Sequence, residues 1–318
     1  MIGRELKLIC GGANAPLSRE ISEALEIGLC DIEFARFSDG EIRLRICETV
    51  RGADVFVIQP TCPPVDEHLM ELLVILDALR RASVRQAIAV VPYYGYARQD
   101  RKHTGRVPIT ARLVANLLET AGADRVLTMD LHAGQIQGFF NISVDNLRGD
   151  PVFAQYIRDA GWPMDSTVIV SPDVGGTARA RMLAEKLDLP LAVLEKRRSQ
   201  DGSNVEVMNV IGDVQDMRAI LVDDILSSGK TLARATRTLL DHGAADVSAC
   251  CTHGVFSPGA LDRLREEHLK RIVVTNTITH QQAAESDLVD YIPIGKHLAK
   301  TIRRIFENKS VSHLFPHY

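Results

Sequence analysis

The chain has 318 residues, of which 46% are hydrophobic and 25% charged, the composition of a globular protein with one large or two ordinary domains. Its net charge of −4 and pI near 6.2 argue against nucleic acid or a membrane surface as the main partner, so any phosphate site should be local. Its six cysteines lack CxxC spacing, and we find no signal peptide and no apolar run approaching about 18 residues. These features predict reduced thiols in a cytoplasmic protein.

Apolar runs typical of strands alternate with amphipathic helical stretches along the whole chain, a pattern that predicts mainly parallel sheets flanked by helices. The expected strands are residues 42–46, 54–58, 86–91, 125–129, 167–170, 219–222, 246–252 and 271–276. The expected helices are residues 17–25, 65–81, 108–121, 150–159, 177–186, 230–241 and 296–307. Cys250 and Cys251 fall in one strand, so we expect their side chains to pack on opposite faces.

The two halves of the chain repeat one pattern. The strand at 54–58 matches the strand at 219–222 with an offset of 164 residues (Val57 to Leu221), and the next strand pair matches with an offset of 160 (Ala87 to Val247). The third pair has an offset of only 146 (Arg125 to Arg271), so the first half contains 160 − 146 = 14 additional residues. We infer two copies of one α/β unit, with a boundary near Gly149 and a basic insertion in the first copy.

Two polar segments of the first half are candidates for ligand binding. Residues 37–41, Phe-Ser-Asp-Gly-Glu, precede an alternating strand and by themselves are typical of a turn. Residues 98–106 contain four fixed positive charges and one imidazole: Arg98, Arg101, Lys102, Arg106 and His103. In an acidic protein such a segment is either a solvated face or a clamp for a polyphosphate, and its lack of apolar residues predicts mobility before a ligand binds.

Acids and a histidine follow two of the predicted strands. Asp130 and His132 come at the end of the strand 125–129, at the edge of the sheet where ligands of α/β proteins bind. Residues two apart on a strand share a face, so we favour a metal or nucleotide role over a structural histidine. Asp173 lies in a strand–turn–helix sequence at 171–177, where the alternative is a simple helix-capping turn. The polar stretch 195–204 is typical of a mobile, hairpin-like loop, in which a solvated turn is the alternative to a catalytic role.

Residues 218–231 are the most informative part of the chain. A predicted buried strand ends in two adjacent carboxylates, Asp223 and Asp224, and a short polar loop then leads into the helix at Lys230. A small-residue loop at a helix N-terminus is an anion site, and acids beside it favour sugar hydroxyls or a metal ion over a solvated turn. A P-loop is excluded because it requires glycine at position 224. The arrangement resembles the phosphoribosyl-binding loop of type I phosphoribosyltransferases. The first copy has Gln59-Pro60 here, so only the second copy should hold a sugar phosphate.

The chain as a whole resembles the ribose-phosphate pyrophosphokinase family. The motifs that carry the resemblance are residues 37–41, 92–102, 130–140, 171–176, 273–278 and the tail 310–315. The block from Asp130 to Phe140 is highly specific to the family. The resemblance implies an α/β protein of two similar domains with the type I phosphoribosyltransferase-like fold. We place these domains at residues 1–148 and 149–318, with a C-terminal tail able to pack back on the first domain.

The resemblance also implies a reaction and its ligands. ATP would transfer its β,γ-pyrophosphate to O1 of ribose 5-phosphate and leave as AMP, in an Mg²⁺-dependent reaction that feeds nucleotide, histidine and tryptophan biosynthesis. The family suggests homo-oligomers, hexamers built of dimers. The resemblance implies ATP and ribose 5-phosphate as partners, and the net charge already argues against nucleic acid or a membrane.

Individual residues receive roles from the same resemblance. The adenine, bound across a subunit interface, would contact Phe37, Asp39 and Glu41. ATP would further be bound by Arg98, Gln99, Arg101 and His132. The magnesium ligands would be His132 and Asp173. The transition state would be stabilised by Lys196 and Arg198. The ribose hydroxyls would be held by Asp223 and Asp224, and the 5-phosphate by Ser227, Ser228, Gly229, Lys230 and Thr231.

The phosphate loop departs from the family pattern. The family has Asp-Thr-Gly-Gly-Thr where this chain has Ser-Ser-Gly-Lys-Thr at 227–231, so the loop gains two units of positive charge. Lys230 replaces a glycine whose backbone angle a lysine would disfavour, unless residue 230 already belongs to the helix. The alternatives to an active enzyme are a weakly active regulatory paralogue that binds nucleotide and a partner subunit, and a phosphoribosyltransferase. We favour the active enzyme because all six implied catalytic, metal and ribose ligands are retained: His132, Asp173, Lys196, Arg198, Asp223 and Asp224.

Overall fold

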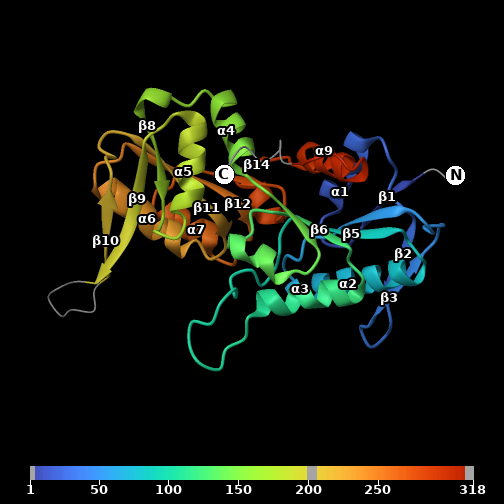
Figure 1. The fold of residues 1–318 in the computed structure, drawn as a ribbon. Coiled ribbons are helices and arrows are strands. Elements are labelled where there is room, and N and C mark those ends of the chain that lie inside the picture. The colour runs from blue at the N-terminus through green and yellow to red at the C-terminus, as the bar shows by residue number, and fades with distance from the viewer. Residues whose placement is uncertain (1–3, 199–205, 312–318) are drawn as a thin grey trace. The chain divides into compact units, whose positions relative to one another are not determined.

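The computed structural model describes residues 4–198 and 206–311, without the side chains of residues 196–198, 206 and 207. The tail motif at 310–315 therefore lies mostly outside the described residues. The chain divides into two units, Met1–Arg148 with Pro293–Tyr318 (unit 1) and Gly149–Ile292 (unit 2). Figure 1 shows the helices and strands of both units, each of which is described by itself.

Unit 1 contains a five-stranded parallel sheet in the order β1-β4-β5-β6-β7. Its strands are β1 (Leu6–Cys10), β4 (Asp54–Ile58), β5 (Gln86–Val91), β6 (Arg125–Met129) and β7 (Ser143–Leu147). The three central strands have the bounds that the sequence predicted, because continuous apolar runs are typical of strands covered on both faces. The two edge strands were not predicted, and the polar sequence of β7 gives no strand signal by itself.

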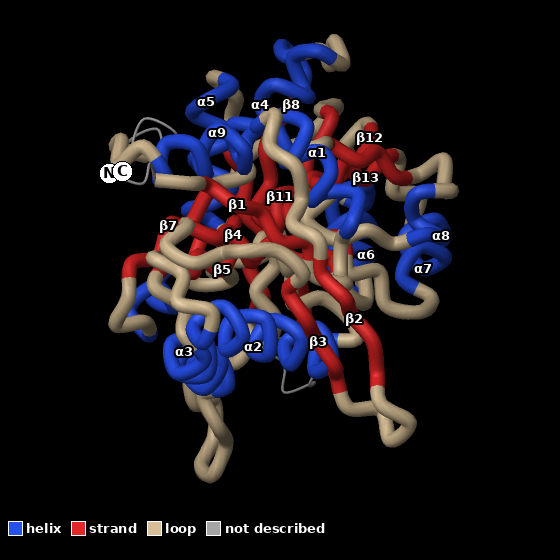
Figure 2. The backbone as a smooth tube through the Cα atoms, turned by 90° about the vertical axis from the view of Figure 1, so that its right-hand side faces the viewer, coloured by secondary structure: helices blue, strands red, loops and turns tan. Residues whose placement is uncertain are grey.

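Helices cover both faces of this sheet (Figure 1). On one face lie α2 (Val65–Arg81) and α3 (Thr110–Ala121), whose apolar side chains pack against alternate residues of the central strands, such as Val55 and Val57. On the other face α1 (Ala15–Leu25) packs against α9 (Gly295–Phe306). An antiparallel hairpin, β2 (Ile32–Arg36) and β3 (Ile42–Ile46), lies beside α2 (Figure 2). A 3₁₀ helix, η1 (Gly134–Phe139), precedes β7.

Unit 2 contains a seven-stranded sheet in the order β10-β9-β8-β11-β12-β13-β14, in which only the β9–β10 pairing is antiparallel. Its strands are β8 (Thr167–Ser171), β9 (Leu191–Arg198), β10 (Glu206–Ile211), β11 (Arg218–Leu226), β12 (Asp246–Gly254), β13 (Arg271–Thr275) and β14 (Val289–Ile292). The sequence predicted the end of β11 at Val222, and this was wrong. β12 continues alongside as far as Gly254, and its pairing keeps the acidic residues of β11 extended.

The helices of unit 2 also form two layers. On one face lie α4 (Asp150–Asp159) and α5 (Thr177–Leu187), and on the other α6 (Lys230–Asp241), α7 (Ala260–Glu266) and α8 (Gln281–Ala284). A short 3₁₀ helix, η2 (Met164–Ser166), leads into β8. Cys250 packs in the core under α4 and α5, and Cys251 in the opposite core, which confirms the prediction from their adjacent positions in one strand.

The two units repeat one topology, which confirms the predicted fold class. The strand order β1-β4-β5-β6-β7 of unit 1 corresponds to β8-β11-β12-β13-β14 of unit 2. The additional residues of the first half lie in the connection from β5 to α3, residues 92–109, which is far longer than the corresponding connection at 255–259. The basic insertion inferred from the offsets is therefore present as a long connection in unit 1.

The C-terminal helix α9 belongs to unit 1, although the sequence placed it in the second domain. The Arg303 guanidinium donates to the Leu25 carbonyl at 2.7 Å, and the Gly295 N–H donates to the Glu20 carboxylate at 3.2 Å. The helix that follows the last strand of unit 2 thus packs on α1, whereas α4, which follows the last strand of unit 1, packs on α5. Among residues 4–198 and 206–311, no helix combines the length and apolar character needed to cross a membrane.

Candidate functional site

The acidic pair lies on β11 beyond the point where this strand has two neighbours. β8 pairs with β11 only as far as Leu221, whereas β12 follows it to Leu226. Asp223 and Asp224 therefore stand at the carboxyl edge of the sheet, where one side of β11 no longer has a partner strand. Because successive side chains of a strand alternate, the two carboxylates start from opposite faces of the sheet. This edge is where ligands bind in α/β proteins.

Arg179 of α5 contacts both carboxylates. Its guanidinium lies 3.2 Å from the Asp224 carboxylate and 3.8 Å from that of Asp223. Asp224 is almost completely buried, whereas 21% of the Asp223 side chain is exposed. The pair is thus asymmetric, with one acid held by an arginine inside the protein and the other facing outward. Sequence analysis missed Arg179, which no motif distinguished from the other cations of α5.

Burial raises the pKa of Asp223 from its ordinary value of 3.8 to about 8, and the negative charge of Asp224 adds to this rise. Arg179 acts in the opposite direction and lowers the pKa of Asp223. Without a ligand, the site thus holds a carboxyl group that is costly to ionise. Acids with raised pKa values at a sheet edge are typical of functional sites.

The loop after β11 consists of Ser227, Ser228 and Gly229, and α6 begins at Lys230. The residue with a left-handed backbone is Gly229, with φ of 72°. A Cβ at this position would lie 3.2 Å from the Ala260 carbonyl oxygen, so the site requires glycine for both reasons. Lys230 is an exposed helical residue. The conflict that the sequence suggested for a lysine in this loop is therefore absent.

Within the described part of the chain, the five consecutive backbone N–H groups from Ser227 to Thr231 have no hydrogen-bond acceptor. Such a row at a helix N-terminus is an anion site. The corresponding connection of unit 1, residues 59–64, contains three prolines, which have no N–H. Its Gln59 and Thr61 N–H groups donate to the carbonyls of Val90 and Tyr93. The two copies thus differ in available N–H donors as well as in acids.

Asp173 follows β8, the strand next to β11. Its carboxylate accepts a hydrogen bond of 2.8 Å from the Gly176 N–H, and its carbonyl accepts one of 2.6 Å from the Ser171 hydroxyl. The turn before α5 therefore has the capping geometry that was the alternative to a metal role. The half-buried carboxylate stands at the same sheet edge as the acidic pair. Among the described residues, no cluster of three or more histidine, cysteine or acidic side chains could hold a metal ion.

The predicted adenine contacts lie in the turn of the β2–β3 hairpin of unit 1. The turn closes through a hydrogen bond of 2.8 Å from the Phe37 N–H to the Glu41 carbonyl. Phe37 is 51% exposed, and Asp39 and Glu41 are exposed as well. Arg36 ties the hairpin to α2 through an ion pair of 2.7 Å with Glu67. The turn thus presents one aromatic ring and two acids to solvent.

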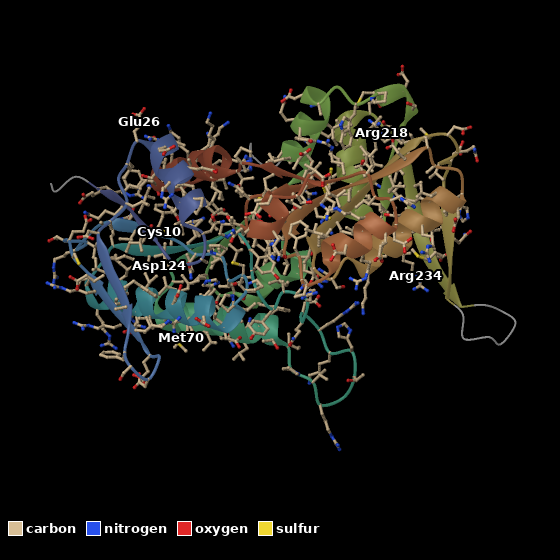
Figure 3. The ribbon with its side chains drawn as sticks, turned by 180° about the vertical axis from the view of Figure 1, so that it is seen from behind. Cys10, Glu26, Met70, Asp124, Arg218 and Arg234 are labelled. Carbon is tan, nitrogen blue, oxygen red and sulfur yellow. The ribbon has the colours of Figure 1, made fainter. Side chains whose placement is uncertain are left out.

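The basic connection begins with an anchored part and continues as an exposed one. The Gln99 side chain accepts a hydrogen bond from the Thr110 hydroxyl, and its carbonyl accepts one of 3.2 Å from the Ala111 N–H. Residues 101–106 are all exposed, as is Arg98. Figure 3 shows this connection extending away from α3 with its side chains in solvent. Arg98 and Arg101 are therefore available to a ligand.

The argument that placed Asp130 and His132 on one face of a strand was wrong. β6 ends at Met129, and Asp130 has φ of 41°, so the two residues are not in extended backbone. Asp130 is buried and its N–H donates to the Leu147 carbonyl at 2.8 Å, whereas His132 is exposed. His132 stays a candidate ligand by its exposure at the end of β6.

Lys196 and Arg198 lie at the end of β9, where the backbone pairs with β10. Their side chains and residues 199–205 lie outside the described residues. The structure therefore brings together Asp173, Arg179, the acidic pair and the phosphate loop in unit 2. It places the hairpin turn, the basic connection and His132 in unit 1.

The chain has two units of one α/β topology. In unit 2 a strand carries an acidic pair and is followed by a row of N–H donors. These features define a protein with the type I phosphoribosyltransferase-like fold. Residues 6–122 match the N-terminal domain of ribose phosphate pyrophosphokinase, and residues 199–316 match the phosphoribosyl synthetase-associated domain. The chain belongs to the ribose-phosphate pyrophosphokinase family.

Relatives match the chain over nearly its whole length. The ribose-phosphate pyrophosphokinase of Caldanaerobacter subterraneus subsp. tengcongensis is 53% identical over 311 residues, 98% of either chain. That of Hyphomonas neptunium is 52% identical over 312 residues, which cover 98% of this chain and 99% of the relative. The crystal structure of phosphoribosylpyrophosphate synthetase from Mycobacterium smegmatis is 41% identical and matches with a TM-score of 0.89. The match covers 96% of this chain and 100% of that one.

The raised pKa of Asp223 predicts how stability depends on pH. Between its ordinary and its raised pKa the folded state binds more protons than the unfolded state, so this group lowers stability as pH rises from about 4 to 8. Asp223→Asn removes this dependence. In the absence of ligand, the variant should melt about 2–4 °C above the wild type near pH 8, for a change of roughly 1 kcal/mol.

The two proteins should melt at closer temperatures near pH 5. Asp224→Asn is the matched control, and it should lower Tm because it weakens the pairing with Arg179. An Asp223→Asn variant that melts below the wild type at both pH values would contradict the assignment.

Lys230 should contribute positive potential at the anion site. An ammonium within about 4–6 Å of a phosphate in a half-exposed site is worth on the order of 1 kcal/mol, or roughly fivefold in affinity. Lys230→Gly should raise KM for ribose 5-phosphate by up to about this factor at low ionic strength, and by less in high salt. Lys230→Ala separates charge from the helix preference of glycine and should give the same shift. Tighter binding by either variant would show that the lysine obstructs the site.

Proposed function

We propose that the protein transfers the β,γ-pyrophosphate of ATP to O1 of ribose 5-phosphate and releases AMP. The observation that carries this proposal is the acidic pair followed directly by five N–H groups without an acceptor among the described residues. Carboxylates accept hydrogen bonds from sugar hydroxyls, and the N–H row suits the 5-phosphate. Membership of the ribose-phosphate pyrophosphokinase family supports the same substrate and the same reaction.

The two acids would have different roles in binding the ribose ring. Arg179 holds the buried carboxylate of Asp224, which fixes its orientation. Asp223 precedes Asp224 on β11 and is the more exposed acid. Hydroxyl groups that donate to Asp223 would favour its ionised form and offset the cost of burial. The 5-phosphate would then lie over Ser227 to Thr231.

ATP would be bound by groups of unit 1. The exposed ring of Phe37 offers a stacking surface for adenine, and Asp39 and Glu41 offer acceptors for its amino group. Arg98 and Arg101 would bind the phosphates, and Gln99 anchors the connection that carries them. The exposure of the hairpin turn supports the idea that it serves the active site of a neighbouring subunit in a homo-oligomer.

Further exposed apolar side chains support a homo-oligomer, which we propose to be a hexamer built of dimers in the cytoplasm. Leu113 and Leu117 of α3 are 53% and 37% exposed, and Met70 of α2 is 53% exposed. They lie on neighbouring helices on the outside of unit 1. Clustered apolar side chains on a surface are typical of subunit contacts.

Asp173 would hold magnesium together with the phosphates of ATP, and the family resemblance implies His132 of unit 1 as a further ligand. The hard Mg²⁺ ion takes oxygen ligands and is commonly bound through one or two carboxylates and substrate phosphates, which fits the half-buried carboxylate of Asp173. When bound, the ion would neutralise charge on the transferring group. The carboxylate is kept in place by its hydrogen bond from Gly176.

Lys196 and Arg198 would stabilise the transition state. Phosphoryl-type transfer spreads negative charge over the transferring group, and cations that reach it lower the barrier. Both residues come at the end of β9 and belong to the polar stretch 195–204 that the sequence predicts to be a hairpin-like loop.

The reaction is tested by measuring AMP release from ATP with and without ribose 5-phosphate. We expect AMP, and an equal amount of phosphoribosyl pyrophosphate, only when both substrates and Mg²⁺ are present. Removal of Mg²⁺ with EDTA should abolish the reaction. Release of ADP in place of AMP, or no ribose-dependent reaction, would contradict the proposed function.

The role of Lys196 has a separate test. Lys196→Ala should lower kcat by roughly 10²–10⁴-fold while KM for ATP changes far less, because the lysine would act on the transition state. Arg197→Ala removes the adjacent charge and should leave kcat much closer to the wild type. Near-normal kcat in Lys196→Ala would remove the residue from the mechanism.

A further inference from the structure

The connection between β12 and α7, residues 255–259, is hydrogen-bonded to the loop that carries the anion site. The Leu226 carbonyl accepts hydrogen bonds from the Val255 and Phe256 N–H groups at 2.8 and 3.1 Å. The Ser227 carbonyl accepts one from the Ser257 N–H at 3.1 Å. The hydroxyl groups of Ser227 and Ser257 form a further hydrogen bond of 3.0 Å.

The next carbonyl of the loop, that of Ser228, accepts a hydrogen bond from the Arg263 guanidinium of α7. Arg263 is half-buried. Its hydrogen bond to residue 228 follows those that the β12–α7 connection donates to residues 226 and 227. Three consecutive carbonyls, from residues 226 to 228, are therefore directed to one side of the loop.

The direction of these carbonyls determines the direction of the N–H groups. In a planar trans peptide the C=O and the N–H point to opposite sides. The N–H groups of Ser227, Ser228 and Gly229 therefore face away from the β12–α7 connection.

We propose that Arg263 is a positioning residue for the 5-phosphate site. The Arg263 side chain fixes the peptide between Ser228 and Gly229, so that the Gly229 N–H faces the phosphate. Arg263 thus acts through this peptide and does not touch the ligand. Ser257 does the same for the preceding peptide. The inference rests on the proposed function and adds to it the residues that hold the loop in a binding conformation.

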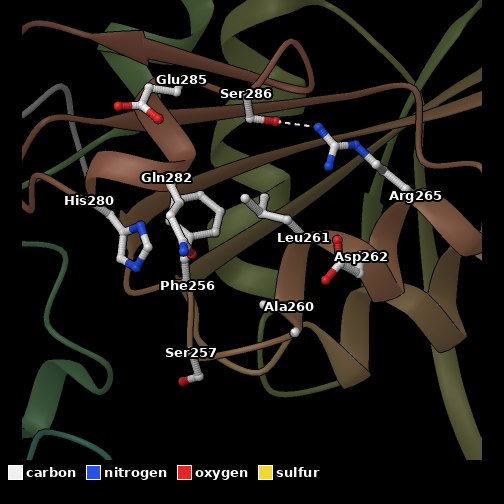
Figure 4. A pocket seen from close by; sticks show the side chains of 11 residues that line it. Phe256, Ser257, Ala260, Leu261, Asp262, Arg265, His280, Gln282, Glu285 and Ser286 are labelled. Carbon is white, nitrogen blue, oxygen red and sulfur yellow. Dashed lines mark hydrogen bonds between the residues drawn. The ribbon is translucent and has the colours of Figure 1, made fainter.

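The surroundings make these hydrogen bonds important. A cavity of about 390 Å³ lies beside the β12–α7 connection (Figure 4). Its described lining includes Phe256, Ser257 and Gly259 of the connection, together with side chains of α7 and α8. Figure 4 shows Ser257 and Ala260 at one end of this cavity. One side of the connection thus faces a cavity. Phe256 is buried in the same hydrophobic cluster as Leu226, and the hydrogen bonds add to this packing in holding the connection against the loop.

The test compares Arg263→Met with Arg265→Met. Arg265 lies on the same helix but is exposed and donates to Ser286 and Asp287, both at 2.9 Å. Because a hydrogen bond to a charged group is commonly worth about tenfold or more in affinity, Arg263→Met should raise KM for ribose 5-phosphate about tenfold. Its kcat and KM for ATP should stay within about twofold. Arg265→Met should match the wild type in all three constants. Arg263→Lys keeps a donor and should recover most of the loss.

The outcomes separate positioning from general stability. An unchanged KM for ribose 5-phosphate in Arg263→Met, or equal rises in both KM values, would overturn the proposal. If Arg263→Met does not fold, Arg263→Gln replaces the charged donor with a neutral one and should raise KM for the sugar about two- to threefold, and no rise would overturn the proposal. If the wild type lacks the proposed reaction, titration calorimetry with ribose 5-phosphate decides: weaker binding by Arg263→Met supports positioning, and equal binding refutes it.

Discussion

A peptide group offers its N–H to a ligand only when its C=O is accommodated on the opposite side, and this constraint determines the anion site of unit 2. The three successive carbonyls of residues 226–228, at the end of β11 and in the loop after it, accept hydrogen bonds from the β12–α7 connection and from Arg263. Gly229 supplies the left-handed turn that lets α6 start directly afterwards. The direction of the N–H donors follows from this arrangement.

The duplication of the fold shows which features belong to the scaffold and which to the site. Both units have the same strand order, and in both a loop leads from the second strand of that order into a helix. In unit 1 this loop is rich in proline and its Gln59 and Thr61 N–H groups are bonded to neighbouring carbonyls. Unit 1 instead has the long basic connection and the exposed hairpin turn. One scaffold thus provides an anion site in one copy and exposed cations in the other.

Most helices and central strands could be predicted from the sequence, because buried apolar runs and helical periodicity are local signals. The bounds of α2, α4 and α6 matched, as did the three central strands of unit 1. The predictions that were wrong concerned features that depend on tertiary contacts. The extension of β11 through its acids requires β12, and the location of α9 requires its contacts with α1. Arg179 and Arg263 became visible only when the fold placed their side chains beside β11 and its loop. Asp130 left the strand through a backbone angle that the sequence did not indicate.

The central claim is that one sugar phosphate binds per chain, on the loop of unit 2. A crystal structure with ribose 5-phosphate tests it most directly. The claim predicts the 5-phosphate within hydrogen-bonding distance, about 2.7–3.2 Å, of N–H groups between Ser227 and Thr231, with ribose hydroxyls on Asp223 and Asp224. The loop of unit 1 at residues 59–64 should be empty. A phosphate bound to that loop or to the basic connection, with the acidic pair of unit 2 unoccupied, would contradict the account.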